Sequence, residues 1–459
     1  MYLHFAFYIF LFLLWGLCFS SSWAAMPTRE AEAANMKVQI MEDDGTATIS
    51  LEATKKFEVR IDVDPGTDSH SIPLQVELPE FGPKVWPTED LHVVDEAGQF
   101  IPIRRNGIQW HKFDMSVPPV RASYFVRAIS RDGSKTAMVH TSEEERTVQS
   151  SEEDISISIC RWYGGRQTAL SIRFDDSHPT HLSKAVPILR EYGLKATFMI
   201  NSGAGGYQSH KEQWEECAKT GVHEFANHTL HHSGAATDEE IEREVGDATK
   251  YIWSLFPQKS KLVALNRGGG TIWTTTRPFS YYLEKYHLFS VFTGSLGMDD
   301  FYGDQVGALR RNLESHIERR LWCKTHFHSI GTGLKTSEEN FRAAIKLVKS
   351  YEPQLWIAGL TDVFKYQEER EASRLLLTRE NPKQFVLQLL CGTDPTLYNQ
   401  PLTIKLTFPG HLSPESVLIQ QQGEEAVCPD AITRHDDRNV ALFHVAPVDS
   451  TFVLDIVDR

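Results

Sequence analysis

The feature that most constrains the fold is a change of rhythm in the middle of the chain. Between about residues 155 and 370, short apolar segments typical of strands alternate with amphipathic segments typical of helices, as in "TALSIRF" followed by "THLSKAVPILREYG". Strands that alternate with helices predict a parallel sheet with helical crossovers. This many units favour a barrel over a small open sheet, so we predict an α/β barrel over residues 155–370.

Strand-like segments without helices flank this region on both sides. "FEVRIDV" at residues 57–63 and "LTIKLTF" at residues 402–408 alternate apolar and polar residues, which is typical of half-buried strands. We predict a β-sandwich-like domain over residues 37–150 and a second all-β, sandwich-like domain over residues 372–459, with the polar segment 141–154 as the first boundary. A chain of 459 residues is too long for one ordinary core, which agrees with three folded parts.

The first 25 residues have the pattern of a signal peptide. The apolar run "FAFYIFLFLLWGLCF" precedes small residues that suit cleavage after Ala24 or Ala25. The run is short for a membrane span, and no later segment is apolar enough to cross a bilayer. We expect a secreted, periplasmic or cell-surface protein, with a membrane-anchored form as the alternative. A formal charge of −14 and the lack of a Lys/Arg run argue against a nucleic-acid partner.

Polar clusters follow the predicted strands of the α/β region, at the points where the strands end. Because the carboxyl ends of parallel strands meet at one mouth of a barrel, side chains that are distant in sequence can share one site there. The clusters are "FDDSHPTH", "NHTLHH", "NRGGG", "GSLGMDDF" and "THFHSIG".

The histidines of "NHTLHH" point to a metal ion. His228 and His232 are four residues apart, which would place both imidazoles on one face of a helical turn, a spacing that suits a zinc-like cation. The 19 histidines in 459 residues give roughly 0.8 such pairs by chance, so the pair alone is weak. The adjacent Asp175 and Asp176 strengthen it, because one carboxylate can bind the metal while the other accepts a proton from an activated water. His231 lies off this face and is interpreted as a packing or hydrogen-bonding residue.

Three further groups complete a predicted hydrolytic site. Arg267 could hold the free aspartate in its ionised form by a charge-assisted contact. The glycines Gly268, Gly269 and Gly270 would let an exposed backbone amide help to bind a developing oxyanion. His328 could donate a proton to the leaving group, because imidazole titrates near neutral pH. Each pattern alone has a structural explanation, as a surface ion pair, a turn and a strand-end histidine, and only the combination indicates catalysis.

The motifs "SIRFDD", "HEFANHTLHH", "NRGGG" and "HFHSIG", in this order, resemble those of the polysaccharide deacetylases with a NodB homology domain, carbohydrate esterase family 4. The resemblance covers about residues 165–370 and implies an irregular (β/α)7 barrel. It implies that Asp175 is the general base and that Arg267 orients it. The implied ligands of a divalent metal are Asp176, His228 and His232.

The resemblance also implies the acid of the reaction. It selects His328 over His326, because "FHSI" matches the last motif of the family. An acidic neighbour that tunes this histidine would be Asp299 or Asp300. We prefer Asp300, because Phe301 follows it where the family usually has an aromatic residue.

The implied function is an exported hydrolase that uses Zn²⁺, with Co²⁺ or a similar ion as alternatives, to remove acetyl groups from a carbohydrate polymer. Amide and ester substrates both fit. This chain has "RGGG" where the family usually has an arginine followed by Pro-Pro-Tyr-Gly, and this departure leaves the identity of the substrate open. Two alternatives are hydrolysis of a C–N bond in a small cyclic amide on the same barrel, and a glycan-binding protein without catalytic activity.

Overall fold

In the computed structural model, the chain forms two compact units. Residues 1–105 and 110–134 form the first unit, and residues 106–109 and 135–459 form the second. The predicted signal peptide and most of the predicted boundary segment 141–154 lie outside the described residues. The structure describes residues 30–41, 45–80, 85–107, 109–128, 147–149, 155–291, 294–381, 384–411, 417–421, 429–434 and 437–456.

The first unit contains antiparallel strands around one core. Strand β4 (Glu58–Asp64) falls on the segment whose alternation predicted a strand, and every second residue of it is buried. The strands belong to two sheets. The buried apolar side chains of both sheets form a single cluster, so the two sheets enclose one core. One sheet has the order β3 (Thr48–Lys55), β4, β10 (Ala122–Ala128), β6 (Leu91–Asp95), β7 (Phe100–Ile101); the strands β1 (Glu30–Ala33), β2 (Met36–Ile40), β5 (Ile72–Glu77), β9 (Lys112–Val117) and β8 (Ile103–Asn106) follow one another in the second.

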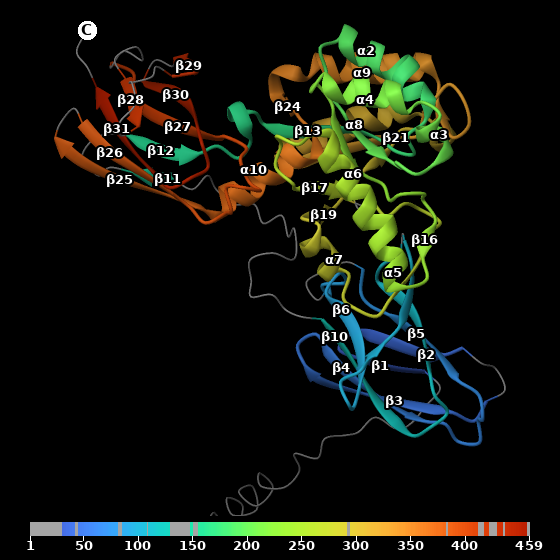
Figure 1. Cartoon of the computed structure of the whole chain (residues 1–459). Helices are drawn as coiled ribbons and strands as arrows, with labels where there is room; N and C mark the ends of the chain where they lie inside the picture. The colour runs from blue at the N-terminus through green and yellow to red at the C-terminus, as the bar shows by residue number, and fades with distance from the viewer. Residues whose placement is uncertain are drawn as a thin grey trace, which may run out of the picture. The chain divides into compact units, whose positions relative to one another are not determined.

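The second unit is organised around a parallel sheet of eight strands (Figure 1). Its central strand β13 (Thr168–Phe174) is buried at every position, as expected for a parallel strand that is covered on both faces. Along the sheet the order is β19 (Leu288–Ser290), β17 (Val263–Leu265), β15 (Glu224–Asn227), β14 (Thr197–Ile200), β13, β21 (Trp322–Phe327), β20 (Leu296–Gly297), and β24 (Leu355–Ile357) also pairs with β13.

The sheet confirms the α/β part of the predicted fold class, but it is a curled half-barrel. Strand β24 pairs with the first half of β13, at residues 168–170, whereas β14 pairs with its last two residues. The strands β19 and β20 lie at the two ends of the described order and are not paired with each other there. A complete (β/α)7 barrel is therefore not confirmed.

Helices connect these strands where the amphipathic segments predicted them. Thr237 is the N-cap of the helix that begins at Asp238, and its side chain accepts a hydrogen bond from the amide of Glu240, as the sequence pattern of a capping box predicts. The helical segments of the unit are η2 (His181–Ala185), α2 (Val186–Glu191), α3 (Gly205–Gln208), α4 (Lys211–Lys219), α5 (Asp238–Ile241), η3 (Glu242–Asp247), α6 (Ala248–Leu255), α7 (Ser280–Lys285), α8 (Gln305–Arg319), α9 (Glu338–Ser350) and α10 (Leu360–Ala372).

A β-sandwich-like part follows the parallel sheet in the sequence and includes one strand that precedes it. Strand β12 (Ser156–Ile159) pairs antiparallel with β27 (Leu402–Pro409), although the sequence analysis placed residue 155 and those after it in the α/β region. A strand's partner is not encoded in its own residues, which is why local patterning did not predict this pairing. One sheet has the order β11 (Thr147–Gln149), β12, β27, β30 (Arg438–Val445), β29 (Ala431–Arg434), and the other β25 (Ser373–Asn381), β26 (Gln384–Cys391), β31 (Ser450–Ile456), β28 (Val417–Gln421).

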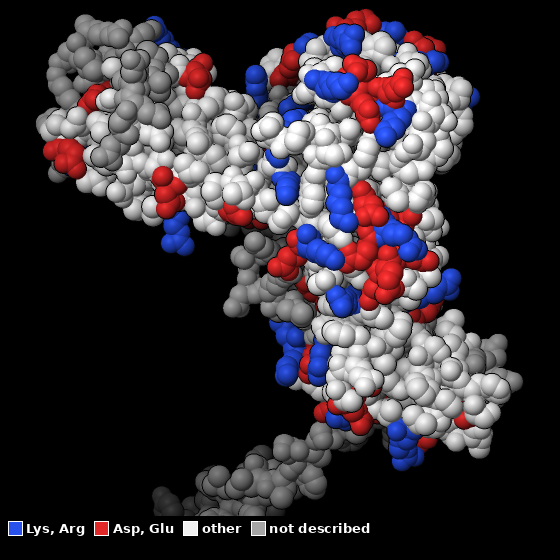
Figure 2. Space-filling model, viewed as in Figure 1, with Lys and Arg blue, Asp and Glu red and all other residues white. Residues whose placement is uncertain are grey.

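Charged side chains of both signs lie close together on the surface of α5, η3 and α6 (Figure 2). Lys250 forms an ion pair with Asp247 at 2.9 Å, and Lys285 forms one with Glu242 at 2.6 Å.

Within the described part of the chain, no helix has both the length and the apolar character needed to cross a membrane.

Candidate metal centre

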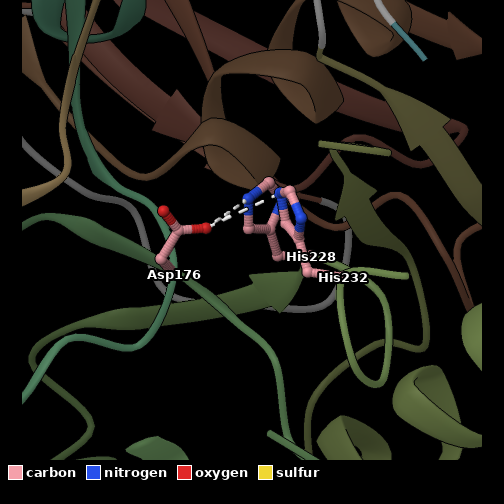
Figure 3. Close-up of side chains that lie close together, drawn as sticks. All are labelled: Asp176, His228 and His232. Atoms are coloured by element: carbon pink, nitrogen blue, oxygen red, sulfur yellow. Dashed lines mark ion pairs between the residues drawn. The ribbon is translucent and has the colours of Figure 1, made fainter. Parts of the chain in front are cut away.

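Three ligand atoms from two strand ends converge at the carboxyl end of the parallel sheet (Figure 3). Asp176 follows β13, and His228 and His232 lie in the loop after β15. The Asp176 Oδ1 atom is 3.2 Å from Nε2 of His228 and 3.7 Å from Nε2 of His232. Ligands at about 2.0–2.1 Å from a tetrahedral zinc ion are roughly 3.3 Å apart, so these separations suit a shared ion. The structure therefore brings the predicted ligands together.

A hydrogen bond at Nδ1 fixes the orientation of the His228 imidazole. Nδ1 of His228 lies 2.9 Å from the carbonyl oxygen of Asn266, which can only accept a hydrogen bond. Nδ1 therefore carries a proton, and Nε2 is the nitrogen that faces Asp176 and His232 and would bind a cation once it is unprotonated. Burial would lower the pKa of His228, but the hydrogen bond to Asp176 and the negative charge of Asp175 raise it. The same negative potential would attract a divalent cation.

The loop that carries the two histidines is not helical, so the predicted helical turn is wrong. Thr229 has φ of 69° and His232 has φ of 61°, in the left-handed region that a β-branched residue such as threonine rarely adopts. Side-chain hydrogen bonds support this path. Asn227 Oδ1 accepts from the amide of Thr229 at 2.7 Å, and Thr229 Oγ1 accepts from the amide of His232 at 3.0 Å. The two imidazoles meet because of this local turn rather than because of a helical period.

The two adjacent aspartates lie in different environments, as predicted. The side chain of Asp176 is 42% exposed, whereas that of Asp175 is 5% exposed. Oδ2 of Asp175 accepts hydrogen bonds from Arg173 at 2.9 Å and from Asn266 at 3.3 Å. Its Oδ1 is buried and has no hydrogen-bond partner among the described protein groups. One oxygen of Asp175 is thus held in place and the other is available as an acceptor.

Nearby charges keep Asp175 ionised in spite of its burial. Burial alone would raise the pKa of this carboxyl, but the charges of Arg173 and His228 lower it below the ordinary value. The pKa of Asp176 is also lowered, because its hydrogen bond with His228 and the charges of both histidines outweigh burial. Both carboxyl groups are therefore anionic near neutral pH.

The structure gives Asp175 a cationic partner that was not predicted, Arg173, and the role predicted for Arg267 stays a prediction. The guanidinium of Arg267 lies over the ring of Phe279, 5.1 Å from its centre, and its NH1 group is 3.4 Å from Ser290 Oγ. Arg173 pairs with Asp175, and both side chains are 5% exposed. The two residues are two positions apart at the end of β13, so they share one face of the strand. That spacing, and a charged residue inside a buried strand, were the signals in the sequence for Arg173.

His328 is hydrogen-bonded to Asp299, so the preference for Asp300 is wrong. Nδ1 of His328 lies 2.6 Å from Oδ2 of Asp299, whose side chain is 0% exposed. Burial would lower the pKa of His328, but the hydrogen bond and charge of Asp299 raise it. Asp300 instead accepts from the amide of Ser337 at 2.8 Å and from Asn340 at 2.9 Å, at the start of α9. Adjacent residues point in different directions, and the sequence did not determine which of the two faces the histidine.

The second histidine of this strand end has a different environment. Nδ1 of His326 lies 3.1 Å from Ser295 Oγ, and burial with the charge of Arg173 lowers its pKa to about 4. It is therefore neutral near pH 7. His181, which is fully buried, contacts the carbonyl oxygen of His328 through Nε2 and supports the backbone there.

The glycine segment after Arg267 packs against the loop that carries His228 and His232. Gly268 has φ of +80°, and a Cβ placed there would lie 2.3 Å from Nε2 of His232. Only glycine allows this approach. The amide of Gly268 donates to Asn266 Oδ1 at 3.2 Å, so it is already engaged. Gly269 and Gly270, which continue into a turn, remain the part of the predicted oxyanion segment to be tested.

Asn266 is the other residue that the sequence analysis did not single out. Its side chain contacts both Asp175 and the amide of Gly268, and its carbonyl oxygen holds His228. It thereby connects the predicted base, a predicted metal ligand and the glycine segment. Its place beside Arg267 in "NRGGG" gave no separate signal.

The residues present fit a divalent cation. Two imidazole nitrogens and a carboxylate oxygen, all within 4.8 Å of one another, are a donor set that zinc uses in catalytic sites, where a further position stays open. Asp175 is adjacent to Asp176 in the sequence. Its Oδ1 atom is buried and has no hydrogen-bond partner among the described protein groups. A metal-assisted hydrolase with a separate base would need a carboxylate of this kind beside its metal ligands.

Comparison with known proteins identifies the class of domain. Residues 164–278 match the family model for polysaccharide deacetylase. The chain therefore contains a domain of the polysaccharide deacetylase family, as the resemblance of the motifs predicted.

Each of the individual relatives matches only part of this chain, over part of its own length. A poly-beta-1,6-N-acetyl-D-glucosamine N-deacetylase from Staphylococcus aureus is 31% identical over 114 residues, which are 21% of this chain and 39% of that protein. A gellan lyase from a Bacillus species is 21% identical over 282 residues, which are 54% of this chain and 11% of that protein. This chain thus spans well under half the length of either relative. A solved CE4 family pseudoenzyme from Bacillus anthracis is 13% identical, with 43% of this chain and 65% of that chain covered and a TM-score of 0.32.

Proposed function

We propose that this protein is an exported, metal-dependent hydrolase that removes acetyl groups from a carbohydrate polymer. The observation that carries the proposal is the convergence of Asp176, His228 and His232 beside a buried aspartate with one free oxygen. The match to the polysaccharide deacetylase family supports acetyl-group chemistry. Export is supported by the sequence pattern of the first 25 residues.

Asp176, His228 and His232 would hold the cation, with Zn²⁺ or Co²⁺ as the ions that suit two nitrogens and one oxygen. When bound, the cation would polarise the acetyl carbonyl and lower the pKa of a neighbouring water. The hydrogen bond from His228 to Asn266 would keep the ring in the tautomer that binds.

Asp175 would act as the general base through Oδ1. Arg173 and Asn266 fix its Oδ2, so Oδ1 can accept the proton of the water whose oxygen attacks the acetyl carbon. The lowered pKa of Asp175 keeps this oxygen ionised at neutral pH. A carboxylate that is both buried and prearranged needs little reorganisation at the moment of proton transfer.

His328 would act as the general acid. Asp299 binds its Nδ1, which leaves Nε2 to donate a proton to the departing nitrogen or oxygen as the bond to the acetyl carbon breaks. The hydrogen bond and the charge of Asp299 raise the pKa of His328, which favours the protonated donor. The products are acetate and a free amine or hydroxyl group on the sugar. The same residues serve an N-acetyl or an O-acetyl substrate, and the motif departure at "RGGG" leaves both open.

The test is acetate release from a panel of N-acetylated and O-acetylated polysaccharides, with and without chelator. We expect release from at least one polymer, its loss after chelation, and its recovery with added Zn²⁺ or Co²⁺. Failure of every polymer to release acetate in the metal-loaded protein would refute the proposal. Glycan binding that is insensitive to both chelator and Asp175→Asn would favour a binding protein without catalytic activity.

A further inference from the structure

The loop that carries both histidine ligands needs support from outside itself. Thr229 and His232 have positive φ, a conformation that persists only where the surrounding structure fixes it. The hydrogen bonds within residues 227–232 shape the turn, but they do not attach it to the rest of the fold. How firmly residues 227–232 are attached to the rest of the fold determines whether the imidazoles of His228 and His232 keep their position relative to Asp176.

One residue, Glu244, provides three hydrogen bonds to this loop. Its carbonyl oxygen accepts from the amide of Leu230 at 2.8 Å. Its Oε2 accepts from the amide of His231 at 2.9 Å, and its Oε1 lies 2.7 Å from Nδ1 of the same histidine. The side chain of Glu244 is 8% exposed and that of His231 is 52% exposed, so the carboxylate is largely buried while the imidazole is partly open to solvent. Hydrogen bonds to a carboxylate are stronger than those between neutral groups.

The helix around Glu244 is locally widened. Residues Glu242–Asp247 form a π-helical segment, η3, between α5 and α6. Such segments are rare and occur frequently at functional sites, because they change the direction in which side chains and carbonyl groups point. Here the segment places both the carbonyl group and the carboxylate of Glu244 against two consecutive residues of the loop. The third histidine of "NHTLHH" is thereby explained, since His231 anchors the loop instead of binding the metal.

We propose that Glu244 is a positioning residue for the metal centre, which acts through Leu230 and His231 on the ligands His228 and His232. It neither binds the metal nor touches the substrate. This inference rests on the metal site of the proposed function. Loss of the Glu244 carboxylate removes two of its three hydrogen bonds to the loop, both at His231, and leaves the three ligands present. The loop that orients two of the ligands is then held less firmly, so metal affinity falls. Substitution of residues that orient metal ligands typically weakens binding about 10–100-fold.

The experiment measures zinc affinity of the full chain, after removal of metal by dialysis against chelator, by competition with a chromophoric chelator. Glu244→Ala should weaken zinc binding about 10–100-fold, while the circular dichroism spectrum of the metal-free protein stays that of the wild type. Glu244→Gln keeps the shape and one acceptor oxygen, so we expect an affinity between those of Glu244→Ala and the wild type. His231→Ala removes only the bond to Oε1 and should have the smallest effect of the three.

Glu240 offers a matched control on helix α5, which directly precedes η3. Its Oε2 accepts from the amide of Ala236 at 2.7 Å, outside the metal-binding loop. Glu240→Ala should therefore lower the Tm of the metal-free protein and leave zinc affinity unchanged.

The outcomes separate this inference from the proposed function. Wild-type zinc affinity in a folded Glu244→Ala protein would overturn the inference and leave the metal site intact. If Glu244→Ala does not fold, wild-type affinity in both Glu244→Gln and His231→Ala would overturn it instead. A wild-type chain that binds no zinc would overturn the metal site itself, and the inference with it.

Discussion

Replacement of Arg173 by methionine tests how the predicted base is held. The change removes the guanidinium that lies 2.9 Å from Oδ2 of Asp175 and keeps a side chain of similar length. Both partners are 5% exposed, so solvent does not replace the lost interaction. Removal of one partner from a buried ion pair costs about 3–5 kcal/mol. For the second unit, residues 106–109 and 135–459, an unfolding entropy of about 2.1 cal/mol/K per residue converts this cost to a fall in Tm of roughly 4–7 °C.

The same change should alter the acid limb of the pH–rate profile. Arg173 opposes the effect of burial on Asp175, so its loss lets burial raise the pKa of that carboxyl. A base with a higher pKa becomes ionised only at higher pH, so the acid limb of kcat/KM should move upward in pH. A group with a lowered pKa stabilises the fold above its unfolded pKa of about 3.9 and loses that contribution as the pH falls. The stabilising effect of the pair should therefore be largest at neutral pH.

The assay is acetate release against pH, together with thermal melts of the same samples. Arg370→Met is the matched control, because Arg370 is a buried arginine on α10, 8% exposed, outside the candidate site. We expect kcat/KM at neutral pH to fall about 10²–10⁴-fold in Arg173→Met, the range for loss of general base catalysis, and to change little in Arg370→Met. Arg173→Lys should fall between them. An Arg173→Met protein with wild-type kcat/KM and an unmoved acid limb would refute the assignment of Arg173.

Three further predictions concern the acid, the glycine segment and the base. Asp299→Asn should lower the pKa of His328, so the alkaline limb of the pH–rate profile should move to lower pH; an unmoved limb would contradict the pairing. Because Asp299 raises that pKa, its stabilising effect is present below the unfolded value of about 6.5 and is lost as the pH rises through the folded value. Gly268→Ala should weaken zinc binding in a metal titration, since a Cβ would lie 2.3 Å from His232; unchanged affinity would show that the loop can move. Asp175→Asn should keep zinc and lower kcat about 10²–10⁴-fold, and loss of the metal instead would assign Asp175 as a ligand.

The parallel part of the fold could be predicted from the sequence because each element carries its own signal. The strand β13 lies on "TALSIRF" and the helix α8 on "QVGALRRNLESHIERR", as their apolar patterns predicted. The pairing of β12 with β27, and the curled rather than closed sheet, depend on contacts between distant segments. Local periodicity contains no information about such contacts, so these features could not be predicted.

The candidate site was predicted in part for a similar reason. Residue types and their order placed Asp176, His228 and His232 together, because carboxyl ends of parallel strands share one edge. Which of two neighbouring residues faces the site depends on the local backbone. That dependence explains why Asp299 rather than Asp300 meets His328.

Anomalous diffraction at the zinc absorption edge, from crystals of the zinc-loaded protein, tests the metal centre most directly. We predict one peak about 2.0–2.2 Å from the Nε2 atoms of His228 and His232 and from Oδ1 of Asp176. Oδ1 of Asp175 should face that position without binding the ion. A well-occupied zinc peak elsewhere in the molecule, with none between these three atoms, would contradict the account.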